Sequence, residues 1–394
     1  MEVTVAALLS MSCSSAFFMF RPAPLERERG IERQRREHAQ IVSTALGRES
    51  SIGFGAAAVI APEAPKKENV GTRHKRRIDG TTIRTALSSE AANRGQEAKQ
   101  RFTHTGMQML TIGDRQYKFH HIQPGNVPLA YIECGHGAPV VFVHGSGPTD
   151  LRTWERQIEP FAAHFRVVAY SRRCHYPNPA TGDLAGITST RTHAHDLSDL
   201  ITALGLGRVH LVGFSFGADI VLRLAADRPD LVRTLTITEP PLRSWLATLP
   251  GGAELLTQRA AAILPAKRAV QDGNLEQGAR LFIDGMMGRG VFDGLSPSAR
   301  QRIVSNAHLI GAEPTEIDAV SAEDITRDEA ATIQAPTLLL TGDTSPPMFL
   351  IVSRELARIL PNVEQARISG AAHLLHITHA QVYNAIVLGF LSKG

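Results

Sequence analysis

The chain has 394 residues, of which 43% are hydrophobic and 20% charged, so it can bury a sizeable core as one large domain with additional segments or as two domains. Residues 1–106 hold 17 Lys or Arg and 11 Asp or Glu, whereas the rest of the chain holds 25 and 27, so the body has no basic excess that would favour nucleic-acid binding. The cysteines Cys13, Cys134 and Cys174 have no metal-ligand spacing, and their odd, sparse number argues against a disulfide framework and agrees with a reducing compartment.

Residues 1–106 show no sustained helix or strand period after the first twenty residues, and we expect them to form a disordered basic arm. Val3–Phe20 is apolar, but no basic residue precedes it, and serines dilute it below the hydrophobicity of a membrane span. We therefore expect a cytoplasmic protein without stable membrane insertion. A second interpretation is that translation starts near Met107 or Met109, in which case the arm is not part of the functional protein.

From residue 107 onward, apolar strands and amphipathic helices alternate along the chain. Strand patterns occupy residues 115–123, 127–135, 139–145, 166–171, 209–215, 233–240, 335–343 and 364–369. Helical patterns occupy residues 153–165, 192–206, 216–229, 350–360 and 379–391. Alternation at this density predicts an α/β fold with a mostly parallel central sheet and helices on both faces.

The alternation stops between residues 241 and 334, where helical patterns appear at 253–266, 274–287 and 296–310 and no convincing strand is found. Parallel sheets bind ligands beyond the carboxyl ends of their strands, and a helical insertion at that end would cover such a site. We interpret 241–334 as a helical cap, or lid, inserted between strands 6 and 7. The core then comprises 107–240 and 335–394.

Ser215 lies in the segment VGFSFG, between a predicted strand and a predicted helix. Gly213 and Gly217 lack Cβ atoms, which allows a sharp turn and close packing of the helix on the strand. In that geometry the serine hydroxyl projects above the sheet, at the positive end of the following helix. An ordinary loop serine is the alternative, and the pentapeptide alone does not decide between the two.

A serine hydroxyl needs a base to take its proton, and the base needs an acid to orient it. Asp343 and His373 each follow a predicted strand, in the order serine, acid, histidine, and we predict that Asp343 orients His373. Glu239, at the end of another predicted strand, is the alternative acid. His373, His376 and His379 also have helical spacing, but a metal site is disfavoured because no carboxylate or cysteine accompanies them.

An oxyanion hole needs two N–H donors, which we assign to Phe216, directly after the serine, and to Ser146. Ser146 lies in the segment FVHGSGPTD, after a buried strand, with Gly145 and Gly147 providing conformational freedom. A plain glycine-rich turn is the alternative. A phosphate-binding loop is not supported, because no Gly-Lys-Ser/Thr follows.

Together these segments resemble the α/β-hydrolase superfamily, in the alpha/beta hydrolase-1 group of serine hydrolases with a helical cap. The resemblance extends from about Tyr117 to the C-terminus and rests on HGSG at His144–Gly147, GFSFG at Gly213–Gly217, TGD at Thr341–Asp343 and GAAH at Gly370–His373. It implies an α/β-hydrolase fold and a serine nucleophile that needs no cofactor or metal. The superfamily includes esterases, lactonases, C–C bond hydrolases and cofactor-free perhydrolases, so the resemblance leaves the substrate open.

One segment departs from the family pattern. Many relatives carry Asp-x-Arg-Gly-x-Gly where this chain has YSRRCHYPNP, and Arg172 or Arg173 there could contact a substrate carboxylate or form structural pairs. In addition, the HGSGP segment resembles the oxyanion loop of C–C hydrolases, but Thr149-Asp150 replaces their usual further glycine.

We expect a serine hydrolase that cleaves a small apolar ester, thioester or lactone through an acyl-enzyme, with a small molecule as its partner. A C–C hydrolase, a perhydrolase or a non-catalytic binding protein on the same fold are the alternatives. Pocket walls could come from the cap, and core packing would explain the same residues: Trp245, Leu256, Phe282, Met286 and Met287. The physiological substrate and the oligomeric state do not follow from these patterns.

Overall fold

The computed structural model describes residues 109–393 apart from 126, 181–188 and 313–323. The expected arm, residues 1–106, therefore lies outside the described residues. Among the described helices, none is long and apolar enough to cross a membrane.

Eight strands of the described chain form one sheet, in the order β10-β9-β8-β7-β5-β6-β4-β3. Strand β4 is antiparallel to both β3 and β6, and every other neighbouring pair is parallel. The strands are β3 (His120–Ile122), β4 (Leu129–Cys134), β5 (Pro139–Val143), β6 (Arg166–Tyr170), β7 (Val209–Phe214), β8 (Val232–Thr238), β9 (Thr337–Gly342) and β10 (Val363–Ile368). The predicted mostly parallel sheet is confirmed.

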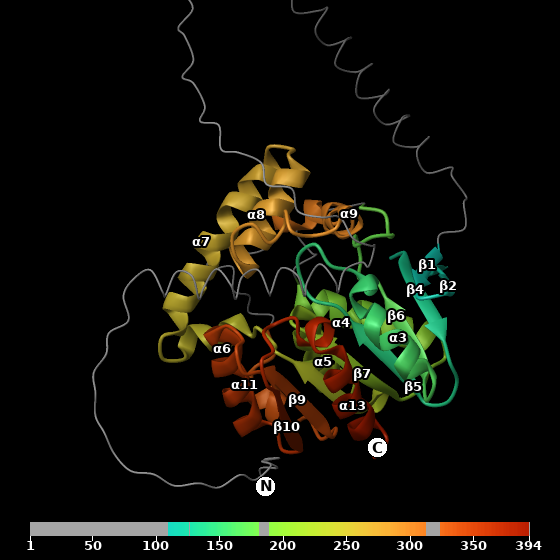
Figure 1. The fold of residues 1–394 in the computed structure, drawn as a ribbon. Helices are drawn as coiled ribbons and strands as arrows, with labels where there is room; N and C mark the ends of the chain where they lie inside the picture. The colour runs from blue at the N-terminus through green and yellow to red at the C-terminus, as the bar shows by residue number, and fades with distance from the viewer. Residues whose placement is uncertain (1–108, 126, 181–188, 313–323, 394) are drawn as a thin grey trace, which may run out of the picture.

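Helices cover both faces of this sheet (Figure 1). Alternate residues of a strand point to opposite faces, so Val141 and Val143 of β5 pack in one cluster while Val140 and Phe142 pack in the other. The first cluster includes residues of α4 (Thr190–Ala203), α5 (Phe216–Asp227) and α11 (Pro347–Ile359). The second includes residues of α3 (Glu155–Ala162) and α13 (Ala380–Leu391). Burial on both faces explains why these strands read as continuous apolar runs.

The strand expected over residues 115–123 is divided in the structure, which corrects that expectation. Residues Arg115–Lys118 form β2, which pairs with β1 (Met109–Ile112) in a separate two-stranded sheet. Phe119 follows with only 5% of its surface exposed, and β3 then joins the large sheet. The strand pattern over residues 115–123 did not reveal that its two halves pair with different strands.

Between β8 and β9, the sixth and seventh strands of the large sheet, the described chain is helical. Figure 1 shows α7, α8 and α9 standing together beyond one end of the sheet. Ile263, Phe282, Phe292 and Ile310 belong to a hydrophobic cluster of their own in this region. The helices are α6 (Arg243–Thr248), α7 (Gly252–Gln271), α8 (Leu275–Met287), α9 (Pro297–Val304) and α10 (Arg327–Ala331), with a 3₁₀ segment at Ala307–Ala312.

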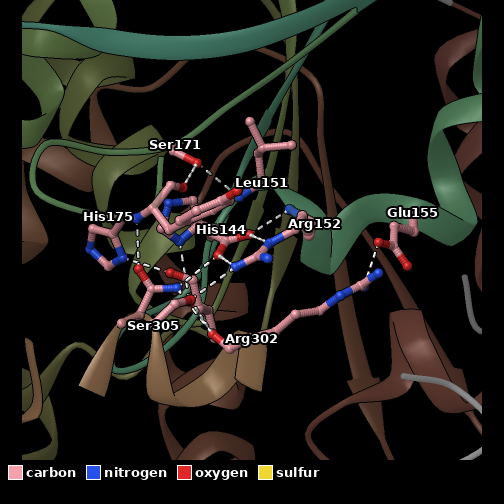
Figure 2. Close-up of polar contacts among 12 residues, drawn as sticks. His144, Leu151, Arg152, Glu155, Ser171, His175, Arg302 and Ser305 are labelled. Carbon is pink, nitrogen blue, oxygen red and sulfur yellow. Dashed lines mark hydrogen bonds and ion pairs between the residues drawn. The ribbon is translucent and has the colours of Figure 1, made fainter. Parts of the chain in front are cut away.

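Polar contacts attach this cap to the loop that follows β5 (Figure 2). Arg302 of α9 pairs with Glu155, with Nη1 and Oε1 2.5 Å apart. The next residues on the cap side are Ser305, whose hydroxyl accepts from Arg152 Nη2 at 3.1 Å, and Asn306, whose amide donates to Asp150 at 2.7 Å. The cap is therefore fixed against the segment that follows the HGSG sequence.

A histidine in the centre of the sheet makes the stability of the fold depend on pH. His210 of β7 is 1% exposed, and its Nδ1 lies 2.8 Å from the Thr234 hydroxyl. Burial, and secondarily the charge of Arg233, lower the pKa of His210 to about 4. The unfolded chain, with a histidine pKa of about 6.5, binds a proton that the folded chain rejects. Stability therefore falls as the pH drops from about 6.5 to about 4 and is insensitive to this group below that range.

We expect His210→Asn to flatten this pH dependence, because asparagine can keep a polar atom near Thr234 but does not titrate. The wild-type free energy of unfolding should lose up to about 1.4 kcal/mol more per pH unit than that of the variant across the window. Urea denaturation between about pH 7 and about pH 4.5 measures the difference. Parallel curves for the two proteins would contradict the assignment.

Candidate active site

Ser215 occupies the sharp turn between the last residue of β7 and the first residue of α5. Its backbone has φ 52° and ψ −124°, a conformation that a residue with a side chain adopts only at a cost of about 1–3 kcal/mol. The Ser215 N–H donates to Thr238 O at 2.8 Å, which extends the ladder between β7 and β8 into the turn. The strained serine between strand and helix has the geometry of a nucleophile elbow.

Two glycines permit this turn. A Cβ on Gly217 would lie 2.2 Å from Val143 O, and a Cβ on Gly213 would lie 2.6 Å from Gly217 O. Either side chain would push α5 away from the ends of β5 and β7. The backbone therefore approaches Gly213 and Gly217 so closely that neither position has room for a side chain, as the sequence predicted.

His373 connects the serine to a carboxylate. Its Nε2 lies 3.2 Å from Ser215 Oγ, and its Nδ1 lies 2.7 Å from Glu239 Oε2. An ionised carboxylate only accepts hydrogen bonds, so this pair assigns the proton to Nδ1 and leaves Nε2 free to accept from the serine. The arrangement of hydroxyl, imidazole and carboxylate is the one that activates a serine for nucleophilic attack.

Glu239 is held firmly at the end of β8. Its side chain is fully buried, and its backbone φ of 48° is unusual for a residue other than glycine. The second carboxylate oxygen, Oε1, accepts from the Gly342 N–H at 2.8 Å and from the Ser345 hydroxyl. Both oxygens therefore have partners, and the one facing His373 is fixed in direction.

Asp343 does not occupy the position that the sequence predicted, so the prediction that it orients His373 is wrong. Its exposed carboxylate accepts from the Ser369 hydroxyl at 3.0 Å and from the Gly370 N–H at 2.7 Å. Asp343 thus holds the backbone of the loop that leads to His373, whereas the residue after β8 reaches the imidazole. Glu239, the alternative acid, is therefore the carboxylate in contact with His373.

Two aromatic rings hold the imidazole, and no local sequence pattern indicated them. The Phe349 ring is stacked on His373 with 3.8 Å between centroids and 8° between planes. The ring centroid of Phe214, the residue directly before the serine, lies 4.7 Å from that of His373. Phe349 is 2% exposed and comes from α11, so the helix after β9 contributes packing where an acid was expected.

One glycine of the predicted oxyanion loop lies against the nucleophile, and another lies against the cap. A Cβ on Gly145 would lie 3.3 Å from Ser215 Cβ. Gly147 has φ 66°, and a Cβ there would lie 2.7 Å from Cζ of Phe282 on α8. Phe282, a pocket candidate, therefore covers this loop from the cap side. The roles of the Ser146 and Phe216 N–H groups stay predictions.

The other pocket candidates have packing roles in the structure. Trp245 is 2% exposed, and its indole N–H donates to Ile325 O at 2.7 Å within the main core, which also contains Leu256. Met286 and Met287 are partly buried against the hydrophobic cluster of the cap. Core packing, the alternative explanation at the outset, accounts for these four side chains.

The two arginines after β6 have different environments. Arg173 forms a bidentate pair with Asp196, with N–O distances of 2.6 and 2.5 Å. Arg172 is buried; its Nη2 donates to Gly145 O at 2.6 Å, and its Nη1 lies 2.9 Å from His193 Nε2. His193 lies on α4 and is fully buried.

The histidines that follow His373 are not arranged as a metal site. His376 is buried against Phe214 and Trp154, and burial, with the nearby His373, lowers its pKa to about 3. His379 instead has its Nδ1 2.9 Å from the Thr378 hydroxyl. Within the described ranges, no group of three or more His, Cys, Asp or Glu side chains could hold a metal ion.

The sequence of this chain is similar to those of known proteins. A family model described as alpha/beta hydrolase fold matches residues 138–380. The (E)-2-((N-methylformamido)methylene)succinate hydrolase of Acinetobacter baylyi is 23% identical, over 66% of this chain and 93% of that protein. A protein of Azorhizobium caulinodans assigned as the carbamate hydrolase RutD is 27% identical, over 68% of this chain and 97% of its own length.

Solved structures agree at the level of the fold. The carboxylesterase CesB of Bacillus subtilis superposes with a TM-score of 0.54 and 21% identity, over 71% of this chain and 93% of that protein. The epoxide hydrolase CorEH superposes with a TM-score of 0.55 and 19% identity, over 70% of this chain and 99% of its own.

The two acidic residues can be compared directly through the reactivity of Ser215. Glu239→Gln should lower the rate of Ser215 labelling by a fluorophosphonate by about 10³–10⁴-fold, because an amide no longer fixes the imidazole tautomer. Asp343→Asn, the matched control, should leave the rate within about threefold, because Asp343 contacts the loop and not the ring. Mass spectrometry of the labelled chain over time measures both rates. The opposite ranking would restore Asp343 as the acid.

Proposed function

The chain belongs to the α/β-hydrolase superfamily, and we propose that it is a serine hydrolase that cleaves a small apolar ester, thioester or lactone through an acyl-enzyme. The observation that carries the proposal is the continuous contact from Ser215 Oγ through His373 to Glu239, at 3.2 and 2.7 Å. Its order and distances suit proton transfer away from the serine as the hydroxyl attacks a carbonyl.

In the first half-reaction, His373 Nε2 takes the proton of Ser215 while Oγ bonds to the substrate carbonyl carbon. The resulting imidazolium lies between its carboxylate partner and the stacked ring of Phe349. It then gives the proton to the leaving oxygen or sulfur as the bond to the acyl carbon breaks. Glu239 stays ionised throughout and holds the ring in one orientation.

The negative charge that develops on the carbonyl oxygen needs N–H donors that are already in place. Phe216 and Ser146 supply them in this proposal. The Phe216 N–H is at the N-terminus of α5, where the helix dipole adds to the attraction. The loop that contains Ser146 approaches Ser215 at Gly145, where a Cβ would lie 3.3 Å from Ser215 Cβ.

In the second half-reaction, water replaces the leaving group. His373 takes a proton from the water, whose oxygen bonds to the acyl carbon, and the bond to Ser215 Oγ breaks as the serine regains its proton. The products are a carboxylic acid and free enzyme. No step requires a group beyond the side chains described and water.

The reaction class is supported more directly than the substrate. Ser215 is only 6% exposed, and Phe282 presents an aromatic ring at the oxyanion loop, which together favour a small acyl group with an apolar surface. One relative is named a carbamate hydrolase, so carbamates belong in the substrate panel beside esters, thioesters and lactones.

Ser215→Ala should abolish fluorophosphonate labelling and lower kcat for p-nitrophenyl esters by about 10⁶-fold, because the nucleophile is gone. Wild-type protein should show a burst of p-nitrophenol and an added acyl mass on the chain. Steady-state kinetics and intact-mass measurement test this, with Ser146→Ala as a control that keeps the backbone donor. Well-folded wild type that neither labels nor turns over would overturn the proposal in favour of a binding protein.

Phe282→Ala should broaden the acyl preference, because it removes the ring that contacts Gly147. The ratio of kcat/KM for octanoate and butyrate esters should rise about tenfold, the lower end of what one methylene is worth in an apolar pocket. Met287→Ala, which trims a side chain of the cap cluster, should leave that ratio unchanged. An unchanged ratio in Phe282→Ala would place the acyl chain elsewhere.

A further inference from the structure

One backbone carbonyl near the serine attracts an unusual number of donors. Gly145 O lies 2.6 Å from Arg172 Nη2, 2.8 Å from the Thr149 hydroxyl and 3.0 Å from His144 Nδ1. All of these side chains lie in or beside the loop after β5 or directly after β6. A carbonyl has two lone pairs, so this convergence saturates it and fixes its direction.

The chemistry of His144 agrees with its role as a donor to this carbonyl. The backbone N–H of Arg172 donates to His144 Nε2 at 3.0 Å, which makes Nε2 the acceptor and leaves the proton on Nδ1, facing Gly145 O. Burial, and secondarily the charge of Arg172, hold the pKa of His144 well below its usual range, so the ring stays neutral. His144 therefore supports the carbonyl and accepts from Arg172 at the same time.

The same peptide bond that carries Gly145 O also carries the Ser146 N–H. In a trans peptide the C=O and N–H point in opposite directions, so donors that hold the oxygen on one side direct the N–H to the other side. A Cβ on Gly145 would lie 3.3 Å from Ser215 Cβ, so this peptide lies beside the nucleophile. The positively charged guanidinium that donates to this carbonyl also polarises the peptide bond, which makes the Ser146 N–H a stronger donor.

Arg172 reaches the second half of the predicted oxyanion hole as well. Its guanidinium carbon lies 5.1 Å from the centroid of the Phe216 ring, and Phe216 follows the serine. His193, which is in contact with Arg172 Nη1, packs edge-on against the same ring at 5.8 Å. One buried cation therefore contacts the residues on either side of the site where a substrate oxygen would develop charge.

We propose that Arg172 is a positioning residue that aims and polarises the Gly145–Ser146 peptide, so that the Ser146 N–H is preorganised to stabilise the oxyanion. The inference rests on the proposed function, because an oxyanion forms only if Ser215 attacks a carbonyl. It also assigns a role to the Arg-Arg segment, where this chain departs from the common family pattern: Arg172 acts on the site, whereas Arg173 anchors Asp196.

The test compares Arg172→Met and Arg172→Lys with Arg173→Lys. Arg172→Met should lower kcat for p-nitrophenyl acetate by about 10- to 100-fold with KM within threefold, somewhat less than the loss of a complete oxyanion donor. Arg172→Lys keeps the charge but loses the fork of donors, and should recover part of the rate. Arg173→Lys also perturbs an ion pair, one that is partly buried, and should lower stability without changing kcat.

Two further measurements separate positioning from a purely structural role. The affinity for a trifluoromethyl ketone, which forms a tetrahedral adduct on the serine, should fall in proportion to kcat/KM. The stretching frequency of a ¹³C-labelled acyl-enzyme carbonyl should rise in Arg172→Met, because weaker donors polarise that carbonyl less. Thr149→Val removes a neutral donor from Gly145 O. It should also lower the ketone affinity and raise the carbonyl frequency, but by less than Arg172→Met does.

The outcomes are distinguishable. Folded Arg172 variants with unchanged kcat, ketone affinity and carbonyl frequency would overturn the positioning role while leaving the serine hydrolase intact. If Arg172→Met does not fold, Arg172→Lys and Thr149→Val decide the question by the same readouts. Wild-type protein that forms no acyl-enzyme would defeat the proposed function itself.

Discussion

The structure depends on the close approach between α5 and the ends of β5 and β7. Gly217 brings the helix within a distance of Val143 O that no side chain would tolerate, and the intervening turn forces Ser215 into a strained backbone conformation. The strain persists because two strands and a helix constrain it from all sides. Once the serine is lifted above the sheet in this way, every group that serves it must come from the carboxyl end of a strand. The loops after β5, β8 and β10 supply those groups.

Packing then decides which available residue is used. Glu239 and Asp343 both follow strands of a parallel sheet, and both are acids, so composition and spacing do not separate them. Their contacts do, because Glu239 Oε2 lies 2.7 Å from His373 Nδ1, whereas Asp343 accepts from Ser369 and Gly370. Asp343 is used instead to fasten the loop that leads to His373, through the Gly370 N–H. The last residue of β9 also supports the acid that follows β8, because the Gly342 N–H donates to Glu239. Two acids therefore cooperate, one in contact with the ring and one with the backbone that carries it.

The sequence predicted those features that depend on local chemistry. Alternation of strands and helices, the small residues around Ser215 and the order of serine and histidine were all readable, because each reflects a backbone requirement a few residues long. The choice of Glu239, the aromatic stack on His373 and the contact of Arg172 with Gly145 O were not readable. Each joins residues at least 24 positions apart, and the pairing depends on the arrangement of strands and on side-chain rotamers that no local pattern specifies.

The hydrogen-bond network around Gly145 O extends to the helical segment between β8 and β9, which we interpret as a cap. Thr149 donates to Gly145 O, and its neighbour Asp150 accepts from Asn306 on the cap side. Asn306 in turn accepts from the backbone N–H of Tyr176, in the segment that follows Arg172. Because these contacts join the cap to both loops that support the oxyanion peptide, a displacement of the cap would loosen that peptide. If the proposed function holds, specificity set by the cap and rate set by the core would be coupled through these hydrogen bonds.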